Sequence, residues 1–228
     1  NTCMKVLFLT ISQEVHEGSS KALLQLLDGL IPLGIKPLIV LPSKRSLYSY
    51  LKQQKIPCIV IQSGYRMSVY PWADTIKNKI LFLPRLLGRL IINSLATLKL
   101  LCIVNQFKPN LIHTNMSVIS IGYYVARFFQ IPHIWHIREY GALDINTFYY
   151  YPTFRHQLRR YKKNNSYTLC ITKDIQRYNK LATWKNSKVL YDGVLPASSV
   201  THSPKKRPYF LFAGRFEPIK GILPLIDA

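Results

Sequence analysis

The sequence predicts an α/β fold in which helices cover both faces of a parallel sheet. Short apolar runs alternate with segments whose apolar residues recur at helical spacing, beginning with a strand at residues 5–11 and a helix at residues 21–33. Gly34 follows that helix at a position where helices commonly end. Because helices separate the strands, successive strands can run in the same direction, and we expect the sheet to be parallel.

The later elements follow the same alternation. Further strands are expected at residues 36–41, 57–61, 111–113, 133–137, 167–171 and 188–191. Further helices are expected at residues 45–54, 76–107, 115–130, 153–164 and 173–181. Pro84 is expected to begin or kink a helix in the longest of these segments. One face of that helix carries Leu83, Leu86, Leu87, Leu90 and Ile91.

A break in pattern near the end of the chain predicts two domains. Residues 194–208 are rich in Pro, Ser and Lys/Arg without periodicity, which is typical of a linker. We therefore assign a first domain to residues 1–193 and the start of a truncated second domain to residues 209–228. A second domain of typical size would need roughly another 140 residues, so we expect the sequence to be an N-terminal fragment.

Composition and charge narrow the class of protein. With 48% hydrophobic residues in 228, the chain can form a sizeable core, which argues against a disordered protein. The four cysteines are far apart and form no CxxC pair, so we expect free thiols in a reducing compartment and no zinc site. The 31 Lys+Arg against 10 Asp+Glu give a net charge of +21, which predicts attraction to polyanions.

Three polyanions remain open: nucleic acid, anionic lipid and phosphorylated small molecules. The basic residues are scattered and no nucleic-acid-binding module is recognisable. Residues 66–108 combine seven Lys/Arg and one acid with many apolar residues, which predicts peripheral docking on an anionic membrane. The alternative is an ordinary buried helix with a solvated basic edge. We expect no membrane span, because charged residues interrupt the apolar runs before about 20 residues.

The loop after the first strand is one candidate site. Open parallel sheets bind ligands at the carboxyl ends of their strands, and Gly18 with Ser19 stands there at the start of a helix. A glycine allows close backbone approach, and free N–H groups at a helix start suit a phosphate or a sugar oxygen. The loop lacks GxGxxG, which weakens a dinucleotide interpretation. The alternative is an ordinary helix start capped by Ser19 or Ser20.

The segment HIWHIRE is a second candidate. In a strand at residues 133–137, alternation places Ile134, His136 and Arg138 on one face, with Glu139 beside them at the carboxyl end. His113 and Asn115 end the preceding strand, so both can face the same crevice. The alternatives are a structural Arg138–Glu139 pair around a core histidine, and an Asn115 that caps the next helix.

Two further strand ends carry weaker signals, Thr172 and Asp192. A stronger one is GRFEPIKG near the end of the chain, where an apolar run meets Arg215 and Lys220. A guanidinium forks onto phosphate oxygens and a lysine adds a compact charge, so this pair suits a diphosphate. Asp192 would repel a diphosphate and is left out of that site.

In this order, PNLIHTN, HIWHIRE, CITKDIQRY, YDGV and LFAGRFEPIKGI resemble the landmarks of the retaining glycosyltransferases of family 4. That family has the GT-B fold of two Rossmann-like domains, the first binding the acceptor and the second the nucleotide-sugar donor. The resemblance implies sugar transfer with retention and without a metal or other cofactor. It also implies that His136 is catalytic, that Arg215 and Lys220 hold the donor diphosphate, and that the Gly18–Ser19 loop faces phosphate or acceptor.

Under the same resemblance, His113, Asn115, Arg138 and Glu139 are expected to bind substrate. We expect a role in bacterial surface polysaccharide or glycolipid synthesis, in the cytoplasm or at the inner face of the cell membrane. The family's acidic motif, two glutamates seven residues apart, would lie beyond Ala228, so the fragment alone should be inactive. Two other functions stay open: a polyanion- or nucleic-acid-binding module, and another GT-B enzyme such as a nucleotide-sugar epimerase.

Overall fold

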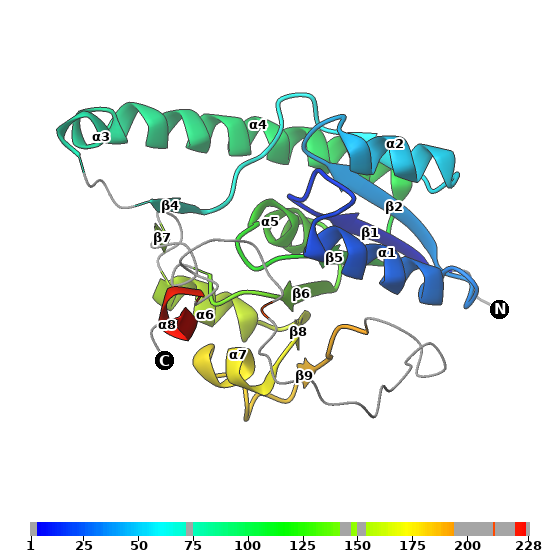
Figure 1. Ribbon diagram of the computed structural model, residues 1–228. Helices are drawn as coiled ribbons and strands as arrows, with labels where there is room; N and C mark the ends of the chain where they lie inside the picture. The colour runs from blue at the N-terminus through cyan, green and yellow to red at the C-terminus, as the bar shows by residue number, and fades with distance from the viewer. Residues whose placement is uncertain are drawn as a thin grey trace. The chain divides into compact units, whose positions relative to one another are not determined.

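The computed structural model describes residues 4–71, 75–141, 147–149, 154–193, 212 and 222–226 (Figure 1). The chain divides into two compact units, Asn1–Asp192 and Gly193–Ala228. Of the second unit, the structure describes Phe212 and a short helix, α8 (Ile222–Ile226). The predicted diphosphate ligands Arg215 and Lys220, and the predicted linker, lie outside the described residues.

The first unit is built on a seven-stranded sheet in which all neighbouring strands are parallel, as the sequence predicts. Its spatial order is β3-β2-β1-β5-β6-β8-β9. The strands are β1 (Lys5–Leu9), β2 (Lys36–Leu41), β3 (Cys58–Val60), β5 (Leu111–Thr114), β6 (His133–Ile137), β8 (Ser166–Cys170) and β9 (Ser187–Val189). The order changes direction between β1 and β5, and the crevice at such a point is where open α/β sheets bind ligands.

Helices cover the sheet on two sides (Figure 1). The described helices of the first unit are α1 (Gly18–Leu30), α2 (Ser46–Gln53), α3 (Ile76–Ile80), α4 (Phe82–Phe107), α5 (Ile121–Phe128), α6 (Phe154–Tyr161) and α7 (Lys173–Tyr178). Alternation along β1 divides the core, because Phe8 packs with α1 and α2 while Leu7 and Leu9 pack with α4 and α5. Farther along that second face, Trp135 and Ile137 pack with α6 and α7.

One small sheet was not predicted. β4 (Val69–Pro71) pairs antiparallel with β7 (Thr147–Tyr149). Each has three residues, and the pairing joins segments nearly eighty positions apart. Local periodicity carries no signal for such short strands.

The long predicted helix at residues 76–107 is two helices, α3 and α4. Pro84 is the third residue of α4, where its missing N–H leaves no hydrogen bond unmade. The buried side of α4 carries Ala96, Leu100 and Val104. Of the predicted leucine-rich face, Leu83, Leu87 and Ile91 are exposed.

α4 also changes the prediction about membranes. It is 26 residues long and contains an 18-residue window of mean hydropathy 1.7, of which 17% is buried. By length and composition alone, this helix is able to cross a membrane, so charged residues do not by themselves exclude such a segment, and the absence of a span stays a prediction. Residues 90–107 carry a single charge, Lys99, and the other cations lie nearer the start of the helix.

Gly122 in α5 is required by close packing, and this yields a prediction. A Cβ added there would lie 2.6 Å from Thr114 Oγ1 and 3.1 Å from Leu9 Cδ1. We expect Gly122→Ala to destabilise the fold by about 1–3 kcal/mol, measured by urea unfolding. Gly18→Ala is the matched control, because a Cβ on Gly18 meets no atom within 4 Å. Equal stabilities for the two variants would contradict the packing of α5 on β1 and β5.

Candidate functional site

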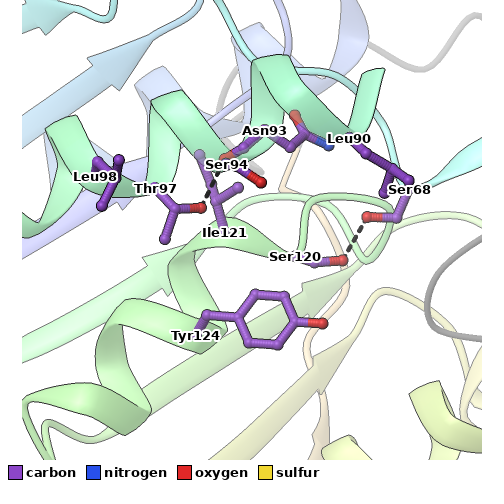
Figure 2. A pocket seen from close by; sticks show the side chains of 9 residues that line it. All are labelled: Ser68, Leu90, Asn93, Ser94, Thr97, Leu98, Ser120, Ile121 and Tyr124. Atoms are coloured by element: carbon purple, nitrogen blue, oxygen red, sulfur yellow. Dashed lines mark hydrogen bonds between the residues drawn. The ribbon is translucent and has the colours of Figure 1, made fainter. Parts of the chain in front are cut away.

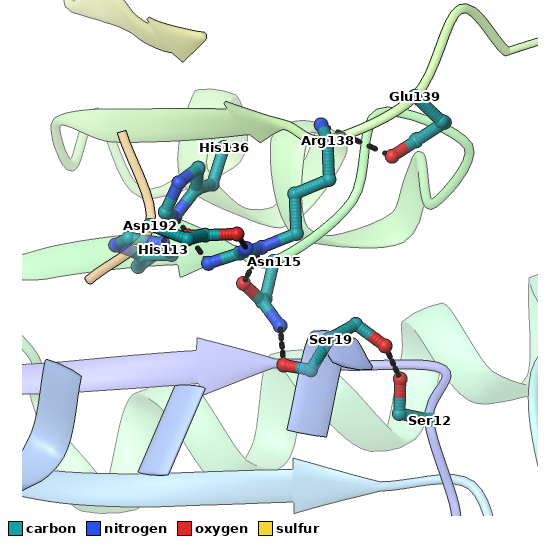
Figure 3. A network of polar contacts seen from close by, with 8 residues as sticks. All are labelled: Ser12, Ser19, His113, Asn115, His136, Arg138, Glu139 and Asp192. Atoms are coloured by element: carbon teal, nitrogen blue, oxygen red, sulfur yellow. Dashed lines mark hydrogen bonds and ion pairs between the residues drawn. The ribbon is translucent and has the colours of Figure 1, made fainter. Parts of the chain in front are cut away.

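Polar side chains gather where β1, β5 and β6 end, on both sides of the point where the strand order reverses (Figure 3). β5 and the loop after it supply His113 and Asn115, and β6 with the residues after it supplies His136 and Arg138. Ser19 comes from the start of α1. The structure therefore brings together most of the site residues that the sequence predicts within its first domain.

The two histidines of this site lie on neighbouring strands and face each other. His113 Nε2 is 3.3 Å from His136 Nδ1, and the two rings meet at a steep angle. His113 also packs on Phe8, with ring centroids 5.0 Å apart, so both histidines lie on the face of the sheet that carries α1. Both side chains are buried. The predicted alternation along β6 is confirmed, because Trp135 and Ile137 pack on the opposite face.

Arg138 joins the separate parts of the site. Its Nε–H donates to Asn115 Oδ1 at 2.8 Å, and one terminal nitrogen donates to Asp192 Oδ2 at 2.5 Å. The other terminal nitrogen lies 3.4 Å from His136 Nδ1. The arginine side chain is only 7% exposed, so its three partners fix it firmly. Asn115 in turn donates from Nδ2 to the backbone carbonyl of Ser19, which ties α1 to the end of β5.

The contact with Arg138 favours one tautomer of His136. A guanidinium has donors only, so a hydrogen bond from Arg138 makes Nδ1 the acceptor and places the hydrogen of a neutral ring on Nε2, whereas a bond donated by Nδ1 to His113 Nε2 would leave Nε2 without it. Nε2 is buried and has no hydrogen-bond partner among the described residues. A buried N–H without an acceptor costs about 1–3 kcal/mol, and such a group calls for an explanation. A ligand whose acceptor atom met this N–H would explain it.

Both histidines of the site are neutral near pH 7. Burial, reinforced by the Arg138 guanidinium, lowers the pKa of His136 to about 3. Burial lowers the pKa of His113 well below its ordinary value, and the neighbouring His136 and Arg138 lower it further. At neutral pH His136 therefore offers a hydrogen-bond donor without a positive charge.

A pH dependence of stability follows. Burial, and to a lesser degree the nearby His113, lowers the pKa of His133 to about 3, as low as that of His136. From pH 6.5 down to about 3 the unfolded chain binds protons at these positions and the folded chain does not, so stability is lost as pH falls through that window. Each histidine contributes a slope of about 1.4 kcal/mol per pH unit. Burial raises the pKa of Glu139, which acts in the opposite sense.

We expect the free energy of unfolding to decrease steadily below pH 6.5, and to decrease less steeply in His136→Gln. Urea unfolding at a series of pH values measures both. A free energy that stays flat between pH 6.5 and 5 in the unsubstituted chain would contradict the burial of three neutral histidines.

Glu139 does not pair with the Arg138 side chain, so the alternative of a structural Arg138–Glu139 pair was wrong. The ionic partner of Arg138 is Asp192. One carboxylate oxygen of Glu139 accepts from Ser117 N at 2.6 Å, from Ser117 Oγ at 2.7 Å and from Val118 N at 3.3 Å. The other accepts from the backbone N of Arg138 at 3.1 Å. Glu139 thus holds the loop after β5 against the end of β6. Its effect on the site is therefore indirect, through the position of this loop.

The capping alternatives are also corrected. The N-cap of α1 is Glu17 without a side-chain cap, so neither Ser19 nor Ser20 caps this helix. Ser19 Oγ is hydrogen-bonded to Ser12 Oγ instead. α5 begins after Ser120 and has no side-chain cap, so Asn115 caps nothing. Thr172 is the exception among the weak candidates, since its side chain caps α7 by accepting from Ile175 N.

Two contacts of the site were not predicted from the sequence. Asp192 was set aside as unfavourable to phosphate, yet it is the ionic partner of Arg138 across 54 positions. Ser117 was not singled out, although it binds Glu139 through two atoms. A signal existed only for Asp192, as an acid that follows a strand in the same sheet. Among the described residues, no group of three or more His, Cys, Asp or Glu side chains is placed to hold a metal ion.

A pocket of about 410 Å³ lies between α4 and α5 (Figure 2). It is lined by Ser68, Leu90, Asn93, Ser94, Thr97, Leu98, Ser120, Ile121 and Tyr124. The loop that joins β5 to α5 carries Asn115 of the histidine site at one end and Ser120 of this pocket at the other. The histidine site and this pocket are therefore neighbours along the chain.

No family model and no curated protein sequence matches the chain, but solved structures do. Anabaena HepE, crystallised with UDP-glucose, superposes with a TM-score of 0.55 and 17% identity over 84% of this chain and 44% of HepE. A glycosyltransferase from Rickettsia africae gives 0.56 and 12% identity over 85% and 44%. Acinetobacter baumannii MurG gives 0.52 and 14% identity over 84% and 47%. This chain thus spans less than half the length of each.

These similarities confirm the predicted fold class. The shared part is an α/β, Rossmann-like unit with a parallel sheet, and its coverage of the similar structures corresponds to one half of a two-domain protein. At such low identity the likeness establishes the fold alone. The chain has the fold of one half of a GT-B glycosyltransferase.

Proposed function

We propose that this chain is the acceptor-side half of a glycosyltransferase of the retaining, metal-independent kind. The enzyme would move a sugar from a nucleotide-sugar donor to a polysaccharide or lipid-linked acceptor. The observation that carries the proposal is the neutral His136, whose buried Nε2–H has no partner among the described residues and stands at the strand-order reversal of the sheet. The fold shared with nucleotide-sugar-binding HepE supports it.

His136 acts in this proposal as a hydrogen-bond donor to a sugar oxygen. A donor held rigidly in a dry site stabilises developing negative charge without the cost of reorienting water. Arg138 is a positioning residue, because its contacts with Asn115, Asp192 and His136 Nδ1 set the tautomer and the direction of the imidazole. Nε2–H is thereby presented to the ligand.

The donor diphosphate needs positive charge from elsewhere. Asp192 already balances Arg138, so this arginine adds little net charge to the crevice. We assign the diphosphate to Arg215 and Lys220, whose chemistry suits it. The Gly18–Ser19 loop adds an uncapped helix start and open space above Gly18, where a ligand can approach the backbone.

The proposal places the enzyme in bacterial surface polysaccharide or glycolipid synthesis, on the cytoplasmic side of the cell. It also holds that residues 1–228 alone do not transfer sugar. The similar structures are more than twice as long as the part that this chain covers, which supports the need for a second domain.

Product analysis tests the proposal. The protein encoded by the whole reading frame would be incubated with a panel of nucleotide sugars and a bacterial glycolipid extract, and products identified by mass spectrometry and anomeric NMR. We expect acceptor-dependent release of nucleoside diphosphate and a product with the donor's anomeric configuration, without added metal. The 228-residue chain should give none. Inversion, a metal requirement or turnover by the chain alone would each contradict the corresponding part.

A further inference from the structure

The outward side of α3 and α4 carries a continuous row of exposed apolar side chains, here called the outer stripe. Its members are Ile76, Ile80, Leu83, Leu87, Ile91, Leu95 and Leu98. Each exposes between 47% and 77% of its surface. Those of α4 recur at steps of three or four residues, which places them along one side of the helix. The opposite side, with Ala96, Leu100 and Val104, packs on the sheet and α5.

The stripe is unusual for a helix in water. A surface helix normally turns its polar side outward, and soluble monomers rarely expose large contiguous apolar patches. Removing apolar side chains from water is favourable in proportion to the area covered, so covering seven half-exposed ones favours binding to an apolar surface. α4 cannot span a membrane in this conformation, because Ala96, Leu100 and Val104 would have to leave the core. It can lie flat on one.

Positive charge borders the stripe. Lys77, Lys79, Arg85 and Lys99 are exposed on α3 and α4. Residues 76–108 contain no acidic residue. Arg89 is different, because it donates to Val69 O and lies over the Tyr70 ring, so the fold uses it. An apolar row with cations beside it matches the surface of an anionic bilayer, where each nearby Lys or Arg contributes about 1 kcal/mol.

The pocket between α4 and α5 opens beside this stripe, and Leu98 belongs to both. Most of its polar groups are already used within the protein. Ser68 and Ser120 hydroxyls bond to each other, and Thr97 Oγ1 donates to the backbone carbonyl of Asn93 (Figure 2). The surface left for a ligand is largely that of leucine, isoleucine and the tyrosine ring. Such a lining favours an apolar chain over a sugar.

We propose that the outer stripe docks on an anionic lipid bilayer and that the α4–α5 pocket takes up one lipid chain from it. The stripe supplies the apolar contact, and the four cations supply the preference for anionic headgroups. This surface is separate from the histidine site, and the proposal does not depend on sugar transfer. If both proposals hold, a lipid-linked acceptor reaches the protein from the bilayer at the pocket, and the loop that joins β5 to α5 connects this pocket to the histidine site.

Vesicle co-sedimentation of the 228-residue chain tests the docking. We expect binding to phosphatidylcholine vesicles that contain phosphatidylglycerol, weaker binding at high salt, and little binding to phosphatidylcholine alone. The double variant Ile91→Gln/Leu95→Gln should bind about thirtyfold more weakly, because two contacts of about 1 kcal/mol each, about 2 kcal/mol together, are lost. Lys77→Gln/Lys79→Gln should reduce the preference for anionic lipid. Leu33→Gln is the matched control, an exposed leucine after α1.

Uptake of a lipid chain is measured with the fluorescent fatty acid cis-parinaric acid. We expect saturable binding that Ser94→Phe, which fills the mouth of the pocket, abolishes. Unchanged vesicle binding by the stripe variants would overturn the docking proposal, and unchanged probe binding would overturn the role of the pocket. A dimer in light scattering that Ile91→Gln/Leu95→Gln dissociates, without vesicle binding, would show that a second copy covers the stripe and would also overturn the proposal.

Discussion

His136→Ala is expected to lower kcat for sugar transfer by about 10²–10³-fold in the protein that contains the second domain, measured on the folded variant. The substitution removes the imidazole nitrogen Nε2, which is buried without a hydrogen-bond partner among the described residues. Alanine also leaves a cavity and takes the Nδ1 acceptor away from Arg138, so we expect stability to fall as well, and the more conservative His136→Gln separates activity from folding. His136→Gln, whose amide nitrogen can reach the position of Nε2, should retain more activity than alanine.

The control is His133→Gln. His133 is a buried histidine with a similarly lowered pKa on the same strand, but its side chain lies on the opposite face and its Nε2 bonds Thr114 Oγ1 at 2.8 Å. We expect kcat of His133→Gln to stay within a few fold of the unsubstituted enzyme when both are folded. Equal losses in the two variants would assign a purely structural role to His136. Steady-state kinetics with thermal unfolding of each variant makes the distinction.

Glu139→Ala is expected to cost about 3–5 kcal/mol of stability, a large part of what a domain of this size possesses. The carboxylate accepts hydrogen bonds from Ser117, Val118 and Arg138, and alanine leaves the backbone N–H groups of all three without this acceptor. Glu139→Gln should cost less, about 1–3 kcal/mol, because one amide oxygen can still face the loop while its NH₂ meets the Arg138 N–H. Urea unfolding measures both.

Asp174→Ala serves as the control for charge removal. Asp174 pairs with Arg177 on the surface of α7, where both side chains are about 70% exposed, so its loss should matter far less. The order Glu139→Ala, Glu139→Gln, Asp174→Ala from most to least destabilising is the expected result. If Glu139→Ala were as stable as Asp174→Ala, the carboxylate would not hold the loop after β5.

Much of the fold could be predicted from the sequence because the pattern is local. Strands buried on both faces are apolar throughout, and the helices between them have a helical period, so the parallel sheet emerged with small errors at element ends. The start of α1 at Gly18, earlier than predicted, reflects the weak signal of a helix without a side-chain cap. β4 and β7 form through a distant pairing that no local pattern records.

The site was predicted in part for a similar reason. Parallel strands end on one edge, so His113, Asn115, His136 and Arg138 could be grouped from strand order alone. The partners within the group depend on three-dimensional contacts. Arg138 pairs with Asp192 and not with the adjacent Glu139, because the Glu139 carboxylate accepts hydrogen bonds from Ser117 in the loop after β5 and from the backbone N–H of Arg138. The direction of the leucine-rich side of α4 could not be predicted, because leucine periodicity shows which residues share a face and not which way it points.

The most direct measurement is ¹⁵N NMR of the His136 imidazole in this chain during addition of bacterial saccharide and glycolipid acceptors. We predict a neutral ring with its hydrogen on Nε2 at pH 7, and a saturable change of that signal when an acceptor oxygen takes up the bond. His133 should respond far less. A protonated or Nδ1–H ring, or a signal that responds to oligonucleotides and to no carbohydrate, would contradict the assignment of this crevice to sugar transfer.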